Sequence, residues 1–153
     1  MPVLKQKSIK PARNIPYAEG ILMYNGTGAS ISANTIVRVD FSAGLQGGGL
    51  RVAVAASDSD RTGGKVPLFV TKHGIPAAKH GVVLPWAILQ NQNTGGLSAG
   101  DTVYLNDVAT GAGGWSGTKI VGAVDRSVGV ILSVSATTGV VWLCPANFSY
   151  GTD

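Results

Sequence analysis

Few side chains in this 153-residue sequence could act as catalytic acids, bases or nucleophiles. Glu19 is the only glutamate, and the closest pair of carboxylates, Asp58 and Asp60, lies in a polar stretch beside serines and an arginine. Charged side chains in such a stretch are ordinarily solvated surface groups. Cys144 ends an apolar run, where a thiol ordinarily packs as a small apolar side chain. We therefore predict that the chain is not an enzyme and has no catalytic residues.

Two further patterns could hold a metal ion or a phosphate group. His73 and His80 lie on either side of Gly74-Ile75-Pro76, but a zinc site needs three or four ligands, and no carboxylate or thiol has suitable local spacing. The glycine-rich segment 44–49 lacks the Lys-Ser/Thr ending of a P-loop, and a strand pattern follows it where a P-loop would continue into a helix. We predict polar loop or interface roles for the histidines and a hairpin loop for the glycines, with no metal and no cofactor.

The N-terminal segment differs from the rest of the chain in composition. Residues 1–13 carry four basic side chains and no acidic one, whereas the rest of the chain carries eight of each charge, so this segment holds the whole formal charge of +4. The segment is also rich in proline and poor in apolar surface, so it cannot form a core of its own. We predict an extended arm over residues 1–18 and a single domain over residues 19–153.

The basic side chains of this arm are Lys5, Lys7, Lys10 and Arg13. Four positive charges could neutralise phosphates on a nucleic acid. However, the arm contains a single aromatic residue near its end, Tyr17, and no aromatic side chains interleaved for stacking on bases. Because the domain behind the arm has no net charge, we favour an acidic protein surface as the partner over direct contact with nucleic acid.

Nothing in the sequence predicts export or membrane insertion. No apolar stretch follows the basic residues as it would in a signal peptide, and no later stretch approaches the roughly 18 uninterrupted apolar residues of a membrane span. A single cysteine can form no internal disulfide. We expect synthesis in the cytoplasm and no membrane partner.

The elements that position these residues are expected to be strands, and the C-terminal third of the chain shows them best. In residues 127–135 every second residue is expected on one buried face: Val128, Val130, Leu132 and Val134. The link that ends at Gly139 joins this strand to the run 140–144, which is apolar on both sides, as in a β-hairpin. A third strand over 101–106 directs Val103 and Leu105 to one face.

The N-terminal part shows the same short alternating runs separated by glycine and proline. We predict strands at 21–24, 35–41, 50–56 and 66–71, and a run at 82–90 in which Pro85 marks an edge or a bulge. The expected buried faces are Val37, Val39 and Phe41 in the second run and Leu50, Val52 and Val54 in the third. No window has a helical period, so we predict an all-β sandwich or barrel of about nine short strands behind the N-terminal arm.

The order of six short segments in this sequence resembles that of one known protein family. The segments are LFVTK (68–72), IPA (75–77), GVVLPW (81–86), GDTVYL (100–105), VGVIL (128–132) and GVVWL (139–143), covering most of residues 66–148. Their pattern is similar to that of the capsid decoration, or cement, proteins of tailed bacteriophages. The resemblance implies a small, non-enzymatic virion protein on the outer surface of the capsid. Its partner would be the major capsid protein, and it would form a homotrimer, with a homodimer as the alternative.

The resemblance also implies a role for the arm, because such proteins often clamp neighbouring capsid subunits with a terminal segment. By position, that role falls on residues 2–17, with Lys5, Lys7, Lys10, Arg13 and Tyr17 as the expected contacts. The alternative hypothesis is a phage fibre, spike or tail module that binds host glycan through Trp86, Trp115 or Trp142. Trp115 is the best candidate for a surface contact, because the glycines around it indicate an exposed loop.

Packing of Trp115 on its own barrel or on a subunit interface is favoured by the same amphipathic side chain. A small β-barrel enzyme is the third hypothesis, and it lacks any nucleophile, base and acid arrangement in the sequence.

Overall fold

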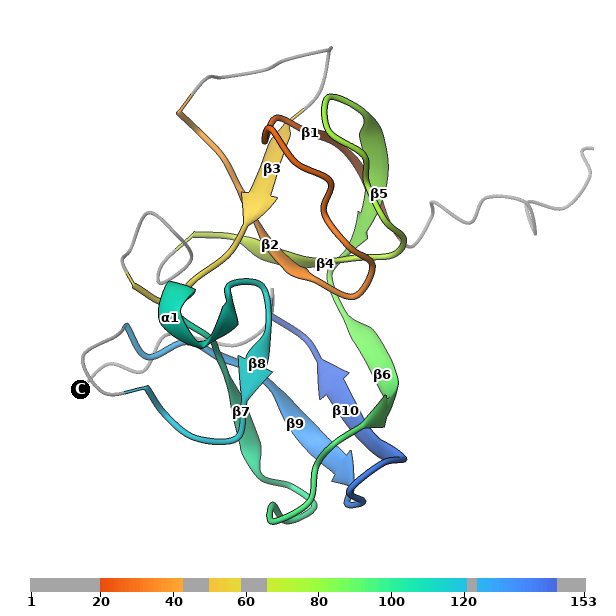
Figure 1. Cartoon of the computed structure of the whole chain (residues 1–153), viewed down its shortest axis with the longest axis vertical. Helices are drawn as coiled ribbons and strands as arrows, with labels where there is room; N and C mark the ends of the chain where they lie inside the picture. The colour runs from red at the N-terminus through yellow and green to blue at the C-terminus, as the bar shows by residue number, and fades with distance from the viewer. Residues whose placement is uncertain (1–19, 43–49, 59–65, 121–123, 146–153) are drawn as a thin grey trace, which may run out of the picture.

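The computed structural model describes residues 20–42, 50–58, 66–120 and 124–145. The predicted arm, the glycine-rich segment 44–49 and Asp60 lie outside these residues. The described part contains ten strands and one single-turn helix, arranged as two stacked β units (Figure 1). The predicted all-β fold is therefore confirmed.

The first unit, in the upper half of Figure 1, is a closed five-stranded barrel. Around the barrel the strands follow the order β1-β3-β2-β4-β5, in which β1 and β3 are parallel and the other pairs are antiparallel. Closure pairs every strand on both sides, which removes the open edges of a flat sheet. The strands are β1 (Ile21–Asn25), β2 (Ile36–Val39), β3 (Arg51–Val54), β4 (Leu68–Thr71) and β5 (His80–Leu84).

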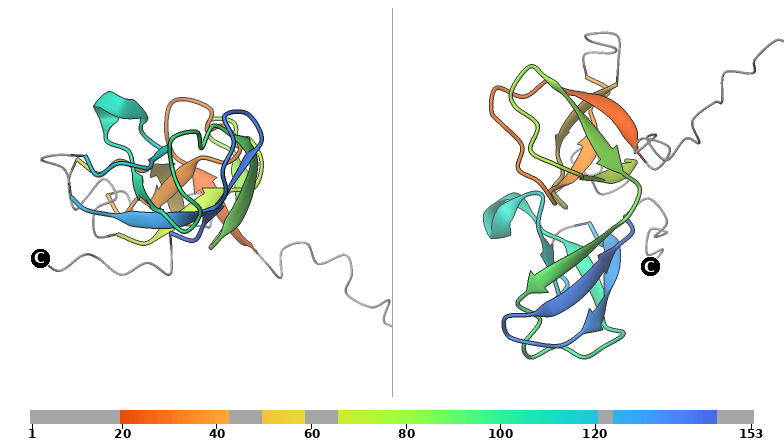
Figure 2. Two further views of the ribbon diagram at one scale, coloured as in Figure 1. Left: turned by 90° about the horizontal axis from the view of Figure 1, so that it is seen from below. Right: turned by 90° about the vertical axis from the view of Figure 1, so that its right-hand side faces the viewer.

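The second unit is an antiparallel five-stranded sheet with the order β6-β10-β9-β7-β8. In the right-hand view of Figure 2, β6 and β10 run side by side below the barrel. The helix α1 (Val108–Gly111) lies between β7 and β8 in the chain. The strands are β6 (Ala87–Gln92), β7 (Thr102–Leu105), β8 (Trp115–Ser116), β9 (Ser127–Ser133) and β10 (Gly139–Leu143).

Two hydrophobic clusters fill these units. One lies inside the barrel: Met23, Ile31, Val37, Val39, Val52, Ile75 and Val83. The other joins barrel strands to the inner face of the second sheet: Ile36, Ala55, Leu68, Val70, Leu89, Val103, Leu105, Val128, Ile131, Val141 and Leu143. Because β2 contributes Ile36 to one cluster and Val37 to the other, its two faces are buried against different units. The shared cluster holds the sheet against the barrel.

Several predicted faces are confirmed and two are only partly correct. Val37 and Val39 are buried, as are Val103 and Leu105. Phe41 is exposed, since β2 ends at Val39 and Phe41 lies beyond the last paired residue. Likewise Leu50 precedes β3 and is exposed, whereas Val52 is buried and Val54 is half-buried.

The predicted buried face of β9 is wrong after Val128. Ile131 is buried in the shared cluster, whereas Leu132 and Val134 are exposed. Val103 pairs with Gly129 but the next residue of β7, Tyr104, pairs with Ser127, so the ladder shifts at this point. Such a β-bulge adds one residue to one strand and reverses its alternation beyond that residue.

Pro85 marks no bulge, but the strand that follows it, β6, lies at the edge of the second sheet, so the prediction of an edge is partly correct. The run 82–90 divides into β5, which belongs to the barrel, and β6, which belongs to the second sheet. Proline has no N–H to donate to a ladder, so pairing ends where the chain crosses between the two units. The predicted hairpin between β9 and β10 is confirmed by their antiparallel pairing.

Candidate interaction surface

The two histidines make structural contacts in separate places. The Val82 N–H donates to His73 Nε2 at 3.2 Å, and His73 Nδ1 lies 2.8 Å from the Gly74 carbonyl oxygen. This pair of contacts fits a ring with its proton on Nδ1. The His80 ring packs edge-to-face on Tyr24, with the ring centroids 5.3 Å apart. In the described part of the chain no three His, Cys, Asp or Glu side chains are grouped closely enough to hold a metal ion.

The described carboxylates also serve the fold. Asp58 Oδ1 accepts a hydrogen bond of 2.7 Å from the N–H of Val108, the first residue of α1. Asp107 caps the same helix, and hydrogen bonds from the Thr110 hydroxyl and N–H lower the pKa of its carboxyl group. The Cys144 thiol is buried at the end of β10. These groups are not arranged around a common reaction centre.

A third charged group lies on the barrel. Asp40 lies 3.7 Å from Arg38 and 3.6 Å from Arg51, and Arg51 also donates to the Gly26 carbonyl oxygen at 2.9 Å. A 2.6 Å hydrogen bond from the Ser42 hydroxyl lowers the pKa of Asp40, and the Ser42 N–H and the two guanidinium groups add to the effect against the opposing influence of burial. Through these contacts Asp40, Arg38 and Arg51 connect the end of β2 and the start of β3 to the turn after β1.

The second sheet is different, because its outer face is apolar and open. Four residues that point away from the shared cluster form a row across the strands, in which Ile88 of β6 pairs with Trp142 of β10, Trp142 with Val130 of β9, and Val130 with Thr102 of β7. Ile88 is 52% exposed and Trp142 is 41% exposed. Large apolar side chains at this exposure, side by side, are typical of a surface that another molecule covers.

Two further apolar side chains extend this row. Leu132 lies two residues after Val130, where the register between β9 and β10 shifts, and Trp86 precedes β6; both are exposed. We call the six residues Trp86, Ile88, Thr102, Val130, Leu132 and Trp142 the outer face. Beside Trp86 and Ile88 is a small pocket of about 220 Å³, whose lining also includes Leu84 and Lys72 of the barrel side. Lys72 thus lies at the border of the outer face.

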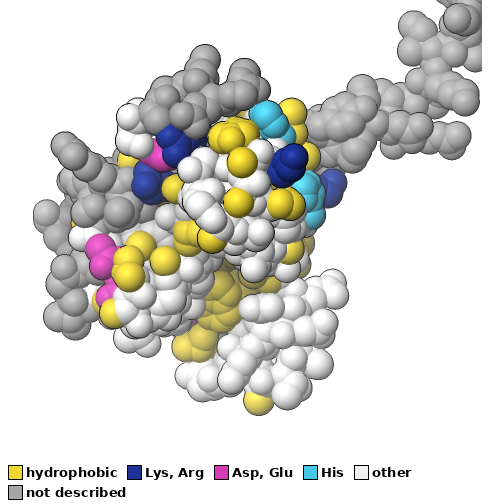
Figure 3. Space-filling view, turned by 45° about the horizontal axis from the view of Figure 1, so that its top comes forward, with side chains coloured by type: hydrophobic (Ala, Val, Ile, Leu, Met, Phe, Trp, Pro, Cys, Tyr) yellow, Lys and Arg dark blue, Asp and Glu magenta, His cyan; other side chains and the backbone are white. Residues whose placement is uncertain are grey.

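Charge is distributed unevenly between the two units. The five strands of the second sheet contain no charged residue, whereas the barrel strands include Arg38 and Arg51 and are followed or preceded by Lys72 and Lys79. In Figure 3 the charged side chains of the described residues gather over the upper and left parts of the view, and its lowest part shows none. Depletion of charge distinguishes the centres of protein interfaces from ordinary surface.

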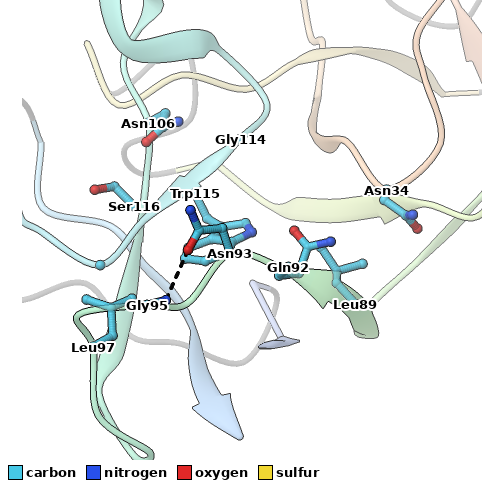
Figure 4. A pocket seen from close by; sticks show the side chains of 11 residues that line it. Asn34, Leu89, Gln92, Asn93, Gly95, Leu97, Asn106, Gly114, Trp115 and Ser116 are labelled. Atoms are coloured by element: carbon cyan, nitrogen blue, oxygen red, sulfur yellow. Dashed lines mark hydrogen bonds between the residues drawn. The ribbon is translucent and has the colours of Figure 1, made fainter. Parts of the chain in front are cut away.

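Trp115 lies in β8 and not in the exposed loop that its neighbours predicted. It pairs with Leu105 of β7 and packs, half-buried, against the shared cluster. Its indole borders a pocket of about 570 Å³ (Figure 4). In that view Asn93 and Gln92 lie beside the indole, and the Asn93 side chain accepts a hydrogen bond from the Gly95 N–H. The other lining side chains are also uncharged: Asn34, Leu89, Leu97, Asn106 and Ser116.

The predicted arm contacts Lys5, Lys7, Lys10, Arg13 and Tyr17 lie outside the described residues. The first described residue, Gly20, lies against the end of β5, where a Cβ atom would be 2.4 Å from Val82 Cγ1 and 3.2 Å from Leu84 Cδ2. Gly20 therefore lies next to the crossing between the barrel and the second sheet.

Sequence reasoning identified Trp86 and Trp142 only as stacking candidates and missed the outer face as a whole. The sequence signal for the outer face was the run 140–143, which is apolar on both sides. Among the described residues only one of these sides is covered. No helix in the described ranges is long and apolar enough to cross a membrane. No family model, curated protein or solved structure matches this chain.

Proposed function

We propose that this chain is a structural virion protein that binds the outer surface of a phage capsid and stabilises it by adhesion. The observation that carries the proposal is the uncharged and open outer face of the second sheet. An apolar surface of this kind works by being covered, which suits a protein that assembles on a lattice more than one that turns over a substrate. The family resemblance in residues 66–148 supplies the location, namely the outside of a capsid.

In this proposal the arm attaches the domain to the major capsid protein. Lys5, Lys7, Lys10 and Arg13 place four positive charges within nine residues, which suits an acidic surface between capsid subunits. An extended segment loses conformational entropy when it docks, but it can span two subunits and add a strand to an exposed sheet edge. Several arms on one oligomer, trimeric or dimeric, would bind the lattice far more tightly than one arm.

Co-sedimentation with purified, expanded capsids that lack this protein tests the proposal. The full chain should pellet with the capsids, and a variant without residues 1–16 should stay folded and lose most of its binding. Replacing the four basic arm residues with glutamine should weaken binding in a salt-dependent way. The control is Lys79→Gln, an exposed basic residue on the barrel, which should bind as the wild type does. Full-strength binding by the shortened chain would refute the role of the arm.

The pocket beside Trp115 favours a second candidate function, the binding of a neutral glycan. An aromatic ring surrounded by amide and hydroxyl groups, with no charged group among its lining residues, can stack on a sugar ring and bond to its hydroxyls. A glycan array with the full chain would test this function. Signals that Gln92→Ala and Trp115→Ala reduce, and that Trp86→Ala leaves unchanged, would support it. An array without signals above background would exclude it.

A further inference from the structure

We propose that the outer face of the second sheet is the surface through which this chain binds a second copy of itself. The inference deepens the proposed function, on which it rests for the expectation that the protein works as an oligomer. It assigns that oligomer to named residues: Trp86, Ile88, Val130, Leu132 and Trp142, with Thr102 at the far end of the row.

Trp142 is exposed at a central position of the sheet. β10 lies between β6 and β9, so Trp142 projects from the interior of the sheet and not from an edge. Its two cross-strand neighbours, Ile88 and Val130, are also apolar. Two half-exposed indoles and the aliphatic side chains around them amount to a few hundred Å² of contiguous apolar surface, about the largest patch that a monomer ordinarily shows to water.

β10 carries apolar side chains on both of its sides. Val141 and Leu143 are buried in the shared cluster, while Val140 and Trp142 on the opposite side are only partly covered. Strands with apolar side chains on both sides are typical of sheets that are buried on both faces. Within the described residues one face of β10 is covered, and the other is open to a partner.

The absence of charge on the outer face indicates which partner binds there. A charged partner surface would lose its hydration against these strands and find no opposite charge in return, because the five strands carry none. The basic segment 1–13 is unsuitable for the same reason. The barrel is also unsuitable, since it displays the exposed side chains of Lys72 and Lys79. The outer face of another copy is uncharged and apolar, and it is present at the same concentration.

The border of the patch fits this arrangement. Lys72 lies next to Trp86 and Ile88 in the lining of the small pocket, at the side of the barrel. Protein interfaces commonly have an apolar centre and a polar or charged rim. Lys72 would therefore remain hydrated at the rim while Trp142, at the middle of the row, would become fully buried.

The test is the mass of the full chain in solution, measured by sedimentation over a wide range of concentration. The wild type should form an oligomer, and Trp142→Lys and Ile88→Lys should each raise its dissociation constant at least tenfold. The matched control is Leu22→Lys, which introduces the same charge at a side chain of β1 that is 62% exposed on the barrel. This control should leave the mass unchanged, and circular dichroism should show that all three variants are folded.

A second measurement does not depend on disrupting the interface. Leu132→Cys places a thiol on the outer face, and the native Cys144 is buried and adds little background. A short bis-maleimide should link two copies through this thiol, whereas Leu22→Cys should give no linked pair. A wild type that stays monomeric throughout, or an oligomer that both lysine variants leave intact, would overturn the inference.

Capsid binding by the same variants separates this inference from the proposed function. If Trp142→Lys prevents capsid binding without changing the mass in solution, the outer face contacts the capsid and the inference is wrong, while the proposed function stands. If the variants dissociate as expected but the wild type does not bind capsids, the proposed function is wrong and the self-association stands.

Discussion

Trp142 of β10 and Ile88 of β6 are direct cross-strand neighbours on the uncovered face of the second sheet. On the opposite face of the same strands, Val141 pairs with Leu89, and both are buried in the cluster shared with the barrel. The same pair of strands is therefore apolar on both sides, and the described residues cover only one of them. This relationship leads to the proposal that the chain works by adhesion.

Asn25 should be among the most sensitive polar positions of the barrel. It is fully buried, and its amide donates to the carbonyl oxygens of Ala29, Ile75 and Pro76 while its oxygen accepts from the N–H and hydroxyl of Thr27. Asn25→Ala should lower the free energy of unfolding by about 2–4 kcal/mol, because the buried carbonyl groups lose their donor. Urea unfolding measures the change.

The control for this prediction is Asn93→Ala. Asn93 is exposed and makes one hydrogen bond to a neighbouring N–H, that of Gly95. Its replacement should change the free energy of unfolding by less than about 0.5 kcal/mol. Equal effects at the two positions would contradict the role assigned to Asn25.

Gly129 should not tolerate a side chain. It lies where β9 approaches β10, and a Cβ atom there would lie 2.1 Å from the carbonyl oxygen of Trp142. Since a backbone atom must then move, Gly129→Ala should lower the free energy of unfolding by roughly 1–3 kcal/mol. Gly28→Ala is the matched control, because a Cβ at Gly28 would meet nothing within 4 Å. Thermal unfolding measures the difference between the two variants, and equal midpoints would contradict this expectation.

Asp40 should make the stability of the barrel depend on pH. Its pKa is lowered from the ordinary value of 3.8 in the folded state, so near that pH the unfolded chain binds more protons and stability rises with pH. The contribution of Asp40 to the free energy of unfolding is fully present above the ordinary carboxyl pKa. It is lost as the pH falls through the lower pKa of the folded state. Ser42→Ala removes the largest cause of the shift and should reduce the difference in unfolding free energy between neutral and acidic solution.

The corresponding measurement is urea unfolding at several pH values for the wild type, Ser42→Ala and Asp40→Asn. Asp40→Asn cannot titrate and should show the weakest dependence on acid of the three. A wild type and an Asp40→Asn variant with identical pH profiles would contradict the account of this carboxyl group.

Thr94 should couple the segment after β6 to the hairpin between β9 and β10. It is buried, its hydroxyl lies 3.0 Å from the Ser133 carbonyl oxygen and 3.2 Å from that of Ser135, and it accepts from the Ser135 N–H at 2.9 Å. Thr94→Val keeps the shape and removes these bonds, so it should cost about 1–3 kcal/mol of unfolding free energy. Thr137→Val in the same hairpin is the control and should have little effect.

The strands of this protein could be located from the sequence because local alternation determines them. Val37, Val39, Val103 and Leu105 are buried as the period of two predicts, and the β9–β10 hairpin follows from its short link. These features depend on residues close together in the chain, so a single sequence contains the required information.

The predictions that were wrong concern features that depend on contacts between distant segments. The bulge in β9 arises from its pairing with β7. The crossing at Pro85 arises because the strands on either side of it belong to different units. Trp115 was expected in a loop, but pairing with Leu105 draws it into β8. The outer face could not be predicted, because alternation does not show which of two apolar sides the chain itself will cover.

Cryo-electron microscopy of expanded capsids, imaged with and without the added full chain, tests the central claim most directly. The account predicts new density of the size of this domain at symmetric positions on the outer surface, with the outer faces of the second sheets in contact between copies. Capsids that show no added density after incubation with excess protein would contradict it.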